Sequence, residues 1–200
     1  MHLPIQTAAI QRQFAKFDLV RLLSSVFQPT EGRRICILID LPDLAEAKGM
    51  AFLQNPERKV QQKAHETFYV GLKNGGLDAL GSTGGDMFAY TQTTGSNLDM
   101  PDLCVDMEGN ELSLEKDIYT KYDIVLCVST FSATAPLTAF AKQYGFRGAT
   151  MHGLNDVILN SGLAVNYDDV SRDAEKLRLA MTRADWVEID FVVRSEEHTS

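Results

Sequence analysis

The stretch ICILI at residues 35–39 decides the fold of this chain. Five consecutive apolar residues, without polar residues at alternate positions, are typical of a strand that is buried on both faces. Such strands occur in parallel sheets that helices cover on both sides. We therefore expect a strand here, in a parallel sheet. Asp40 follows it directly and begins the candidate site considered below.

Helical patterns lie on both sides of this strand. Residues 6–27 place apolar side chains near helical spacing, which predicts a first helix. After a loop at 41–54, Asn55 and Pro56 predict the start of a second helix, because Asn caps helices well and Pro is tolerated in the first turn. Residues 74–76, Asn-Gly-Gly, predict its end. The expected apolar face of the second helix contains Val60, Ala64, Phe68 and Leu72.

The rest of the chain alternates between strand and helix patterns. Region 99–121 is polar and rich in turn residues, with a short helix expected near Leu114. Asp168 or Asp169 is expected to cap the last helix. Strands that alternate with helices imply a doubly wound α/β fold, with a mostly parallel sheet and helices on both faces. We expect strands at 87–90, 123–128 and 146–150, and helices at 132–144, 155–160 and 167–183.

The final strand pattern is of a different kind. Apolar and acidic residues alternate over 186–193, which predicts a half-buried strand and the start of a new layer or domain. The tail at 194–200, RSEEHTS, resembles a translated sequencing adapter, although a short polar tail is the alternative. We expect an α/β N-terminal domain at 1–185, the start of a truncated second domain at 186–193, and a non-native tail at 194–200.

Composition excludes several classes of protein. The formal charge of −8 and the lack of clustered basic residues argue against binding to nucleic acid or to an anionic membrane surface. The longest fully apolar runs, such as the one at 35–39, are too short to cross a bilayer. Cys36, Cys104 and Cys127 are odd in number and lack C-x-x-C spacing, which favours reduced thiols. These features predict a cytoplasmic protein.

Polar residues follow three of the predicted strands, at 35–39, 123–128 and 146–150. In a parallel sheet, ligands bind beyond the carboxyl ends of the strands. If these strands are neighbours, their loops share one rim that can hold a polar or anionic ligand at a helix N-terminus. The candidate ligand-contact residues are Asp40, Asp43, Ser129, Thr130, Ser132, Thr134, His152 and Asn155.

The same residues also have simpler explanations. Ser132 or Thr134 is expected to cap the following helix in this alternative, and Asp40 to cap a turn. His152 is then a surface-loop histidine without a task. A loose acidic cluster, Asp99, Asp102 and Asp106, is similarly interpreted as a solvated loop.

Known catalytic motifs are not complete in this sequence. His65 and Glu66 begin like the zinc motif H-E-x-x-H, but Tyr69 stands where the second histidine is required. The glycine-rich segment at 81–85 lacks the G-K-[ST] ending of a phosphate-binding loop and precedes a strand, so we interpret it as a turn. No G-x-S-x-G nucleophile motif occurs. The sequence therefore predicts no catalytic residue and no metal ligand in this chain.

Two runs carry a family resemblance: FSATAPL at 131–137 and YGFRGATM at 144–151. Together with the helix at 167–183 and the strand at 186–193, they resemble the N-terminal domain of aminopeptidase T-type metallopeptidases, the leucyl aminopeptidases. The similarity is closer still to uncharacterised bacterial relatives of that family. His152 departs from the pattern, because proline is expected between the methionine and the glycine.

The resemblance implies a two-domain, often dimeric enzyme that acts on peptides with a pair of divalent metal ions, zinc or cobalt. In that family the metal-binding and catalytic residues belong to the C-terminal domain, and no position of this sequence matches them. The resemblance therefore implies an inactive fragment without a cofactor of its own. Its expected partners are the missing C-terminal domain and a second copy. The alternatives are an α/β domain that binds a small ligand at the polar rim, or an assembly domain.

Overall fold

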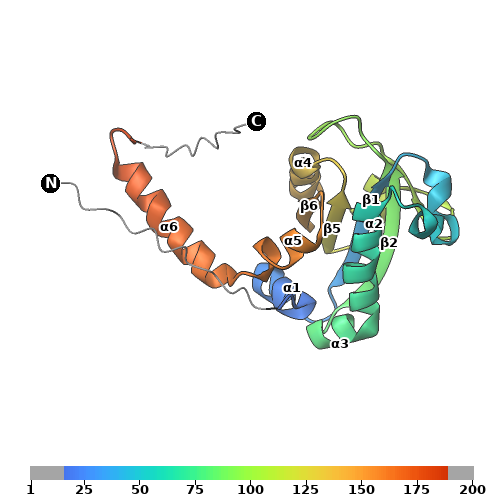
Figure 1. Ribbon diagram of the computed structural model, residues 1–200, viewed down its shortest axis with the longest axis horizontal. Helices are drawn as coiled ribbons and strands as arrows, with labels where there is room; N and C mark the ends of the chain where they lie inside the picture. The colour runs from blue at the N-terminus through green and yellow to red at the C-terminus, as the bar shows by residue number, and fades with distance from the viewer. Residues whose placement is uncertain (1–15, 189–200) are drawn as a thin grey trace, which may run out of the picture. The chain divides into compact units, whose positions relative to one another are not determined.

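The computed structural model describes residues 16–188, and these divide into two units, one up to Val165 and one from Asn166. The first unit is built around a six-stranded sheet with the strand order β4-β3-β2-β1-β5-β6. Figure 1 labels its four parallel strands, β2, β1, β5 and β6. The strands are β1 (Arg34–Leu41), β2 (Thr83–Thr91), β3 (Leu103–Asp106), β4 (Glu111–Ser113), β5 (Ile124–Ser129) and β6 (Arg147–His152).

The helices of the first unit connect these strands. The segment between β1 and β2 contains the 3-10 helix η1 and then a nearly continuous helical stretch that kinks at Asn74 and Gly75. The α-helices are α1 (Leu19–Phe27), α2 (Lys59–Ala64), α3 (Leu77–Leu80), α4 (Thr134–Tyr144) and α5 (Asp156–Leu159). The 3-10 and π segments are η1 (Leu44–Gln54), η2 (His65–Tyr69), η3 (Leu72–Gly76), η4 (Leu114–Ile118) and η5 (Gly162–Ala164).

The expected mostly parallel α/β sheet is confirmed. β1 pairs in parallel with both β2 and β5, and β5 pairs in parallel with β6, whereas β3 and β4 are antiparallel additions. The chain leaves β1 toward β2 but leaves β5 toward β6 on the other side. The boundary between β1 and β5 is therefore the topological switch point, where this class of sheet commonly binds ligands.

Both faces of the central strands are buried. On one face Cys36, Leu38 and Cys127 belong to a core cluster with Tyr119, which follows η4, and Leu137 from α4. Because strand side chains alternate between faces, the intervening isoleucines of β1 face the opposite side. There α2 contacts both β1 and β5. This two-sided burial explains why the apolar run lacks the alternation of a half-exposed strand.

Two helix starts differ from the sequence-based expectation. Within the described residues, α1 begins only at Leu19, because Asp18 caps it by accepting a hydrogen bond from the Arg21 N–H (2.9 Å). The expected start of the next helix at Asn55 was also wrong. The Asn55 side chain accepts from the Glu57 N–H (3.0 Å) in a local turn, and α2 begins at Lys59. Residues 6–15 lie outside the described part.

Two segments expected to be loops or turns contain strands. Region 99–121 forms β3 and β4, and in their connecting turn the Asp106 carboxylate accepts from the Glu108 and Asn110 N–H groups (3.0 and 2.8 Å). Residues 83–85 belong to β2, with an irregularity in the pairing of β1 and β2 at this point. Both segments are strands because they form hydrogen bonds with neighbouring strands, and the number of turn residues in a segment does not predict such pairing.

The second unit contains α6 (Tyr167–Arg183), as the periodicity predicted. Its cap is Asn166, not Asp168 or Asp169, because the Asn166 side chain accepts from the N–H groups of both aspartates (3.0 and 3.4 Å). Residues 186–188 are not in a strand. The remainder of the strand predicted at 186–193, and the tail at 194–200, lie outside the described residues. In the part of the chain that the structure describes, no helix has the length and apolar character needed to cross a membrane.

Candidate functional site

The three strands that precede the predicted polar rim are neighbours in the order β1-β5-β6. Because all three are parallel, their carboxyl ends lie at the same edge of the sheet. This confirms the condition on which the shared rim depended. The residues of the rim nevertheless form separate groups of contacts, and only one of these groups crosses the switch point.

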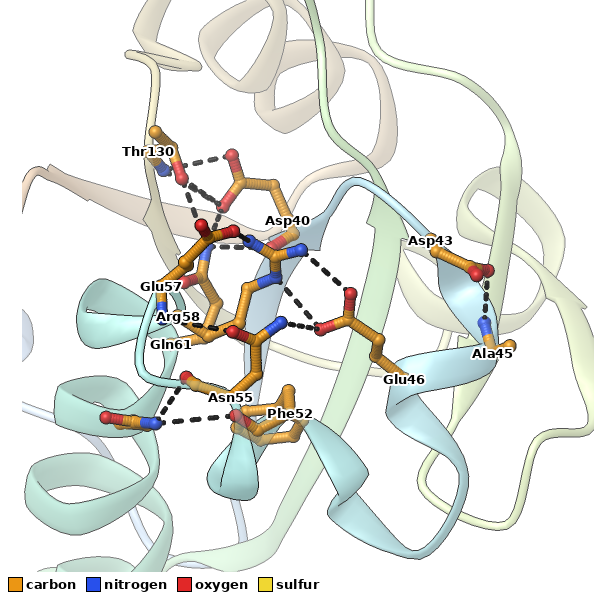
Figure 2. A network of polar contacts seen from close by, with 11 residues as sticks. Asp40, Asp43, Ala45, Glu46, Phe52, Asn55, Glu57, Arg58, Gln61 and Thr130 are labelled. Carbon is orange, nitrogen blue, oxygen red and sulfur yellow. Dashed lines mark hydrogen bonds and ion pairs between the residues drawn. The ribbon is translucent and has the colours of Figure 1, made fainter.

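Asp40 and Thr130 join the ends of β1 and β5. Asp40 is 1% exposed, and its two carboxylate oxygens each lie 2.9 Å from the backbone N–H of Thr130, which donates to them. The Thr130 hydroxyl is a further donor at 3.2 Å (Figure 2). The carboxylate therefore ties together two strands that are adjacent in the sheet but 90 residues apart in the chain.

Two glutamine side chains complete the surroundings of Asp40. Gln61, from α2, donates through Nε2 to the Asp40 carboxylate (2.7 Å) and to the Asp40 backbone carbonyl (2.8 Å). Gln92, directly after β2, donates to the other carboxylate oxygen at 3.1 Å. We call these four residues, Asp40, Gln61, Gln92 and Thr130, the Asp40 network.

The Asp40 network occupies the place where a doubly wound sheet commonly binds its ligand. Each carboxylate oxygen offers about two acceptor sites, and donors of the same chain reach both oxygens of Asp40. A buried carboxylate is costly unless it is fully hydrogen-bonded, so these contacts are what permit its burial. The arrangement is that of a structural connection between strands, helix and loops.

A second polar group lies beside the first. Arg58 donates to both carboxylate oxygens of Glu46 (2.9 and 2.8 Å), and Glu57 is a weaker partner at 3.7 Å (Figure 2). The hydrogen bond with Glu46 raises the pKa of Arg58, although burial opposes the shift, and the more distant charge of Asp40 adds to it. Because Arg58 and Gln61 are three residues apart, the two polar groups meet at the start of α2.

Hydroxyl groups form a third cluster at the start of α4. The Thr134 hydroxyl lies 3.0 Å from that of Ser132 and 2.7 Å from that of Thr150 on β6. The first amides of α4 already have acceptors: Ser132 Oγ takes the Thr134 N–H (3.4 Å), and Asn97 Oδ1 takes the Ala135 N–H (3.0 Å). The N-cap position of α4 is Ala133, which has no side chain that could cap, so Ser132 contacts the first helical amide from one residue before the cap and Asn97 contacts the next.

A shallow groove runs beside the hydroxyl cluster, between α4 and β6. Its walls combine apolar carbon with hydroxyl and basic groups, and its volume is about 420 Å³. The lining residues are Thr134, Leu137, Thr138, Ala141, Lys142, Phe146, Arg147, Gly148 and Thr150.

The remaining candidates serve local structure or stand alone. Asp43 caps η1 by accepting from the Ala45 N–H (2.9 Å), and Asn155 caps α5 by accepting from the Ile158 N–H (3.0 Å). Ser129 donates its hydroxyl to the Phe131 carbonyl (2.6 Å). His152 is exposed at the end of β6, where its backbone pairs in register with Ser129. The eight candidates thus lie in several separate groups of contacts.

Sequence reasoning missed Gln61, Gln92 and Asn97. Gln61 lies three residues before Ala64 and seven before Phe68, so it is on the buried face of the helical stretch. A polar residue in phase with an apolar face was the signal that could have found it. Gln92 and Asn97 lie in a polar connection after β2, where nothing in the sequence distinguishes them from solvated loop residues.

The buried cysteines are poor candidates for nucleophiles. Cys36, Cys104 and Cys127 are all free and buried, as small apolar residues of strands are expected to be. Burial raises the pKa of Cys104 and of Cys127 to about 12 each, and that of Cys36 well above its usual value. At neutral pH these thiols are protonated and unreactive. Among residues 16–188, no group of three or more His, Cys, Asp or Glu residues is arranged to hold a metal ion.

The fold and its contacts define the class of this protein as a doubly wound α/β domain with a polar network closed across its switch point. No protein-family model, curated protein or solved structure matches the chain.

Proposed function

We propose that this chain is a non-catalytic α/β domain of an aminopeptidase T-like, metal-dependent aminopeptidase, in which it shapes substrate access or dimerisation. The observation that carries the non-catalytic role is the Asp40 network. At the point where such a sheet commonly binds a ligand, the Thr130 backbone N–H and the side chains of Gln61 and Gln92 donate to the buried Asp40 carboxylate and occupy both of its oxygens. A site that is closed in this way supports a scaffold more than a catalyst.

The family part of the proposal depends on the sequence resemblance. The run at 131–137 forms the connection from β5 into the first turn of α4, and the run at 144–151 covers the end of α4 and most of β6. Both runs therefore belong to the side of the sheet that carries the hydroxyl cluster and its groove. Under the proposal, this side borders the path of the peptide substrate.

The metal chemistry of the proposed enzyme belongs elsewhere. Two zinc or cobalt ions would activate water for attack on the N-terminal peptide bond, held by the residues of a C-terminal domain beyond this sequence. The present chain would supply no ligand and would bind that domain as its partner. We also propose a cytoplasmic location, which the three free, buried thiols support.

Sequencing the source DNA through the codons for residues 193–200 tests the family assignment. We expect the reading frame to continue past Val193 for roughly 150–200 residues, the size of another domain, with clustered His, Glu and Asp codons. A frame that truly encodes RSEEHTS and then stops would refute the assignment.

An activity assay tests the non-catalytic role separately. The purified chain is incubated with Co²⁺ or Zn²⁺ and a leucine 4-nitroanilide substrate. We expect no turnover above that of the metal ion alone, whereas metal-dependent turnover that increases with protein concentration would refute the role.

The groove between α4 and β6 favours one alternative function, the binding of a small anionic ligand. The side chains of Thr134 and Thr150, whose hydroxyls lie 2.7 Å apart, line the same groove as Lys142, so donors and a positive charge are present in one groove. Thermal unfolding with and without millimolar inorganic phosphate tests this alternative, because a ligand that binds the folded state raises the melting temperature. A shift that disappears in the T134V/T150V double variant would favour the binding function over the scaffold.

A further inference from the structure

The helix α6 has an apolar face that the other described residues of its own unit, from Asn166 to Glu188, do not cover. None of its residues is buried, and Val170, Leu177 and Met181 are 49%, 62% and 54% exposed. A helix of 17 residues is about 25 Å long. Isolated helices not much shorter than this are marginal in water, and most helices are stabilised when an apolar face packs against a partner. We therefore expect the exposed apolar face of α6 to pack against a partner.

The spacing on that face is that of a coiled coil. Val170, Ala174, Leu177 and Met181 are separated by four, three and four residues, which is the alternation of d and a positions in a heptad repeat. With Val170 and Leu177 at d and Ala174 and Met181 at a, Asp173 occupies a g position and lies at the edge of the seam. This pattern predicts that α6 packs against another helix with the same spacing.

We infer that α6 forms a parallel, two-stranded coiled coil with α6 of a second copy of this chain. The charges beside the seam decide both the partner and the direction. In a parallel pair, a g residue faces the e residue five positions later in the partner helix. Asp173 at g therefore faces Arg178 at e, and the two-fold symmetry makes this contact twice.

Antiparallel pairing does not produce these contacts. There g faces g and e faces e, so Asp173 and Arg178 lie on different sides of the seam and never meet. In the single chain both residues form exposed ion pairs within their own helix, Asp173 with Lys176 (3.2 Å) and Arg178 with Glu175 (2.7 Å). Exposed pairs of this kind contribute little, so they compete weakly with contacts between helices.

This inference names α6 as the surface through which the proposed domain forms dimers, and in that respect it rests on the proposed function. The coiled coil itself depends only on residues of α6. A DNA sequence that refutes the aminopeptidase assignment would therefore leave the coiled coil untouched, and a monomeric chain would refute the coiled coil without affecting the assignment.

Two leucines of the same helix provide the first test. Sedimentation equilibrium of the full chain is expected to show dimers, and Leu177→Ala is expected to raise the dimer dissociation constant by about tenfold or more, because it removes a seam side chain. Leu179→Ala is the matched control, because Leu179 is exposed at an f position outside the seam. Alanine preserves helix propensity in both variants. A monomeric wild-type chain, or equal effects of the two substitutions, would overturn the inference.

Cross-linking tests the direction of pairing. A cysteine at position 170 meets its own copy only when the helices are parallel and in register, so Val170→Cys is expected to form a disulfide-linked dimer under mild oxidation. Arg172→Cys, on the outer face, is expected not to do so. The three native thiols are buried and do not compete. Failure of Val170→Cys to cross-link would contradict the parallel arrangement.

A charge exchange tests the choice of partner. Asp173→Arg and Arg178→Asp singly place like charges opposite each other, and each is expected to weaken the dimer several-fold. The D173R/R178D double variant restores opposite charges across the seam and is expected to recover most of the wild-type association. Double-variant association as weak as that of the single variants would show that these charges do not face one another.

Discussion

The backbone N–H of Thr130 donates to both carboxylate oxygens of Asp40, and its nitrogen lies 2.9 Å from each. This contact connects the ends of the two central strands, β1 and β5. This contact lies at the switch point of the sheet, where the chain leaves the parallel strands β1 and β5 toward opposite edges of the sheet. Gln61 adds α2 to the same carboxylate. One buried carboxylate therefore connects both strands and a crossover helix.

Replacement of Asp40 by Asn is expected to lower the free energy of unfolding by about 2–4 kcal/mol. The amide places donor hydrogens against the Thr130 N–H and the glutamine amides, which leaves buried donors without acceptors. Urea denaturation measures the change. Asp43→Asn is the matched control, because Asn also caps helices and the change should remain within about 0.5 kcal/mol. Equal effects of the two substitutions would contradict a special role for Asp40.

Replacement of Gln61 by Glu is expected to make the free energy of unfolding decrease as the pH rises from acidic values. A second carboxylate 2.7 Å from Asp40 cannot ionise without repulsion, so the pair retains a shared proton and its upper pKa is raised in the folded state. The stabilisation is then complete at low pH and is lost as pH rises through that folded pKa. Unfolding measured from pH 4 to pH 8 should show the variant losing stability relative to wild type, and a constant difference would refute the prediction.

The ion pair of Glu46 with Arg58 is expected to contribute more than that of Glu57. Glu46 binds the guanidinium through two short hydrogen bonds and is 22% exposed, whereas Glu57 is 80% exposed and 3.7 Å away. We expect Glu46→Gln to cost about 1–2 kcal/mol. Glu57→Gln should change stability by less than about 0.5 kcal/mol. Urea denaturation of both variants measures the two losses of unfolding free energy. A larger loss for Glu57→Gln than for Glu46→Gln would disprove the prediction.

Gly84 is expected to tolerate no side chain. Its φ angle is +87°, and an added Cβ would lie 2.6 Å from the Ile35 carbonyl oxygen, a backbone atom of β1. We expect Gly84→Ala to lower the unfolding free energy by about 2 kcal/mol or more. Gly32→Ala is the control, because its φ angle of +81° is similar but nothing lies within 4 Å, so only backbone strain remains. Thermal unfolding of both variants separates contact from strain.

His65 is expected to destabilise the protein as the solution becomes mildly acidic. Burial lowers its pKa below 6.5, and its ring is stacked on Tyr69 with centroids 5.2 Å apart. The unfolded chain therefore takes up the proton first, and stability falls as pH decreases through about 6.5. Because the ring is partly exposed, we expect a loss of less than about 1 kcal/mol between pH 7.5 and pH 5.5. His65→Gln should remove this part of the slope, and an unchanged slope would contradict the assignment.

Much of the local structure could be predicted from the sequence, because its causes are local. The apolar run at 35–39 predicted β1, and the periodicity at 167–183 predicted α6. The ranges expected for α4 and α5, 132–144 and 155–160, end within two residues of the observed bounds, since a cap or a left-handed residue acts within one turn. The start of α2 was wrong because the Asn55 side chain serves a turn with the same chemistry as a cap.

The sequence by itself determined the class of fold and named Asp40 and Thr130 as residues of one rim. Only the tertiary structure decided that they contact each other, and that Gln61 and Gln92 complete their surroundings. It also decided that β3 and β4 form a hairpin. The physical reason is the same in each case: hydrogen bonds between distant segments depend on strand order and register, which no local pattern of residues encodes.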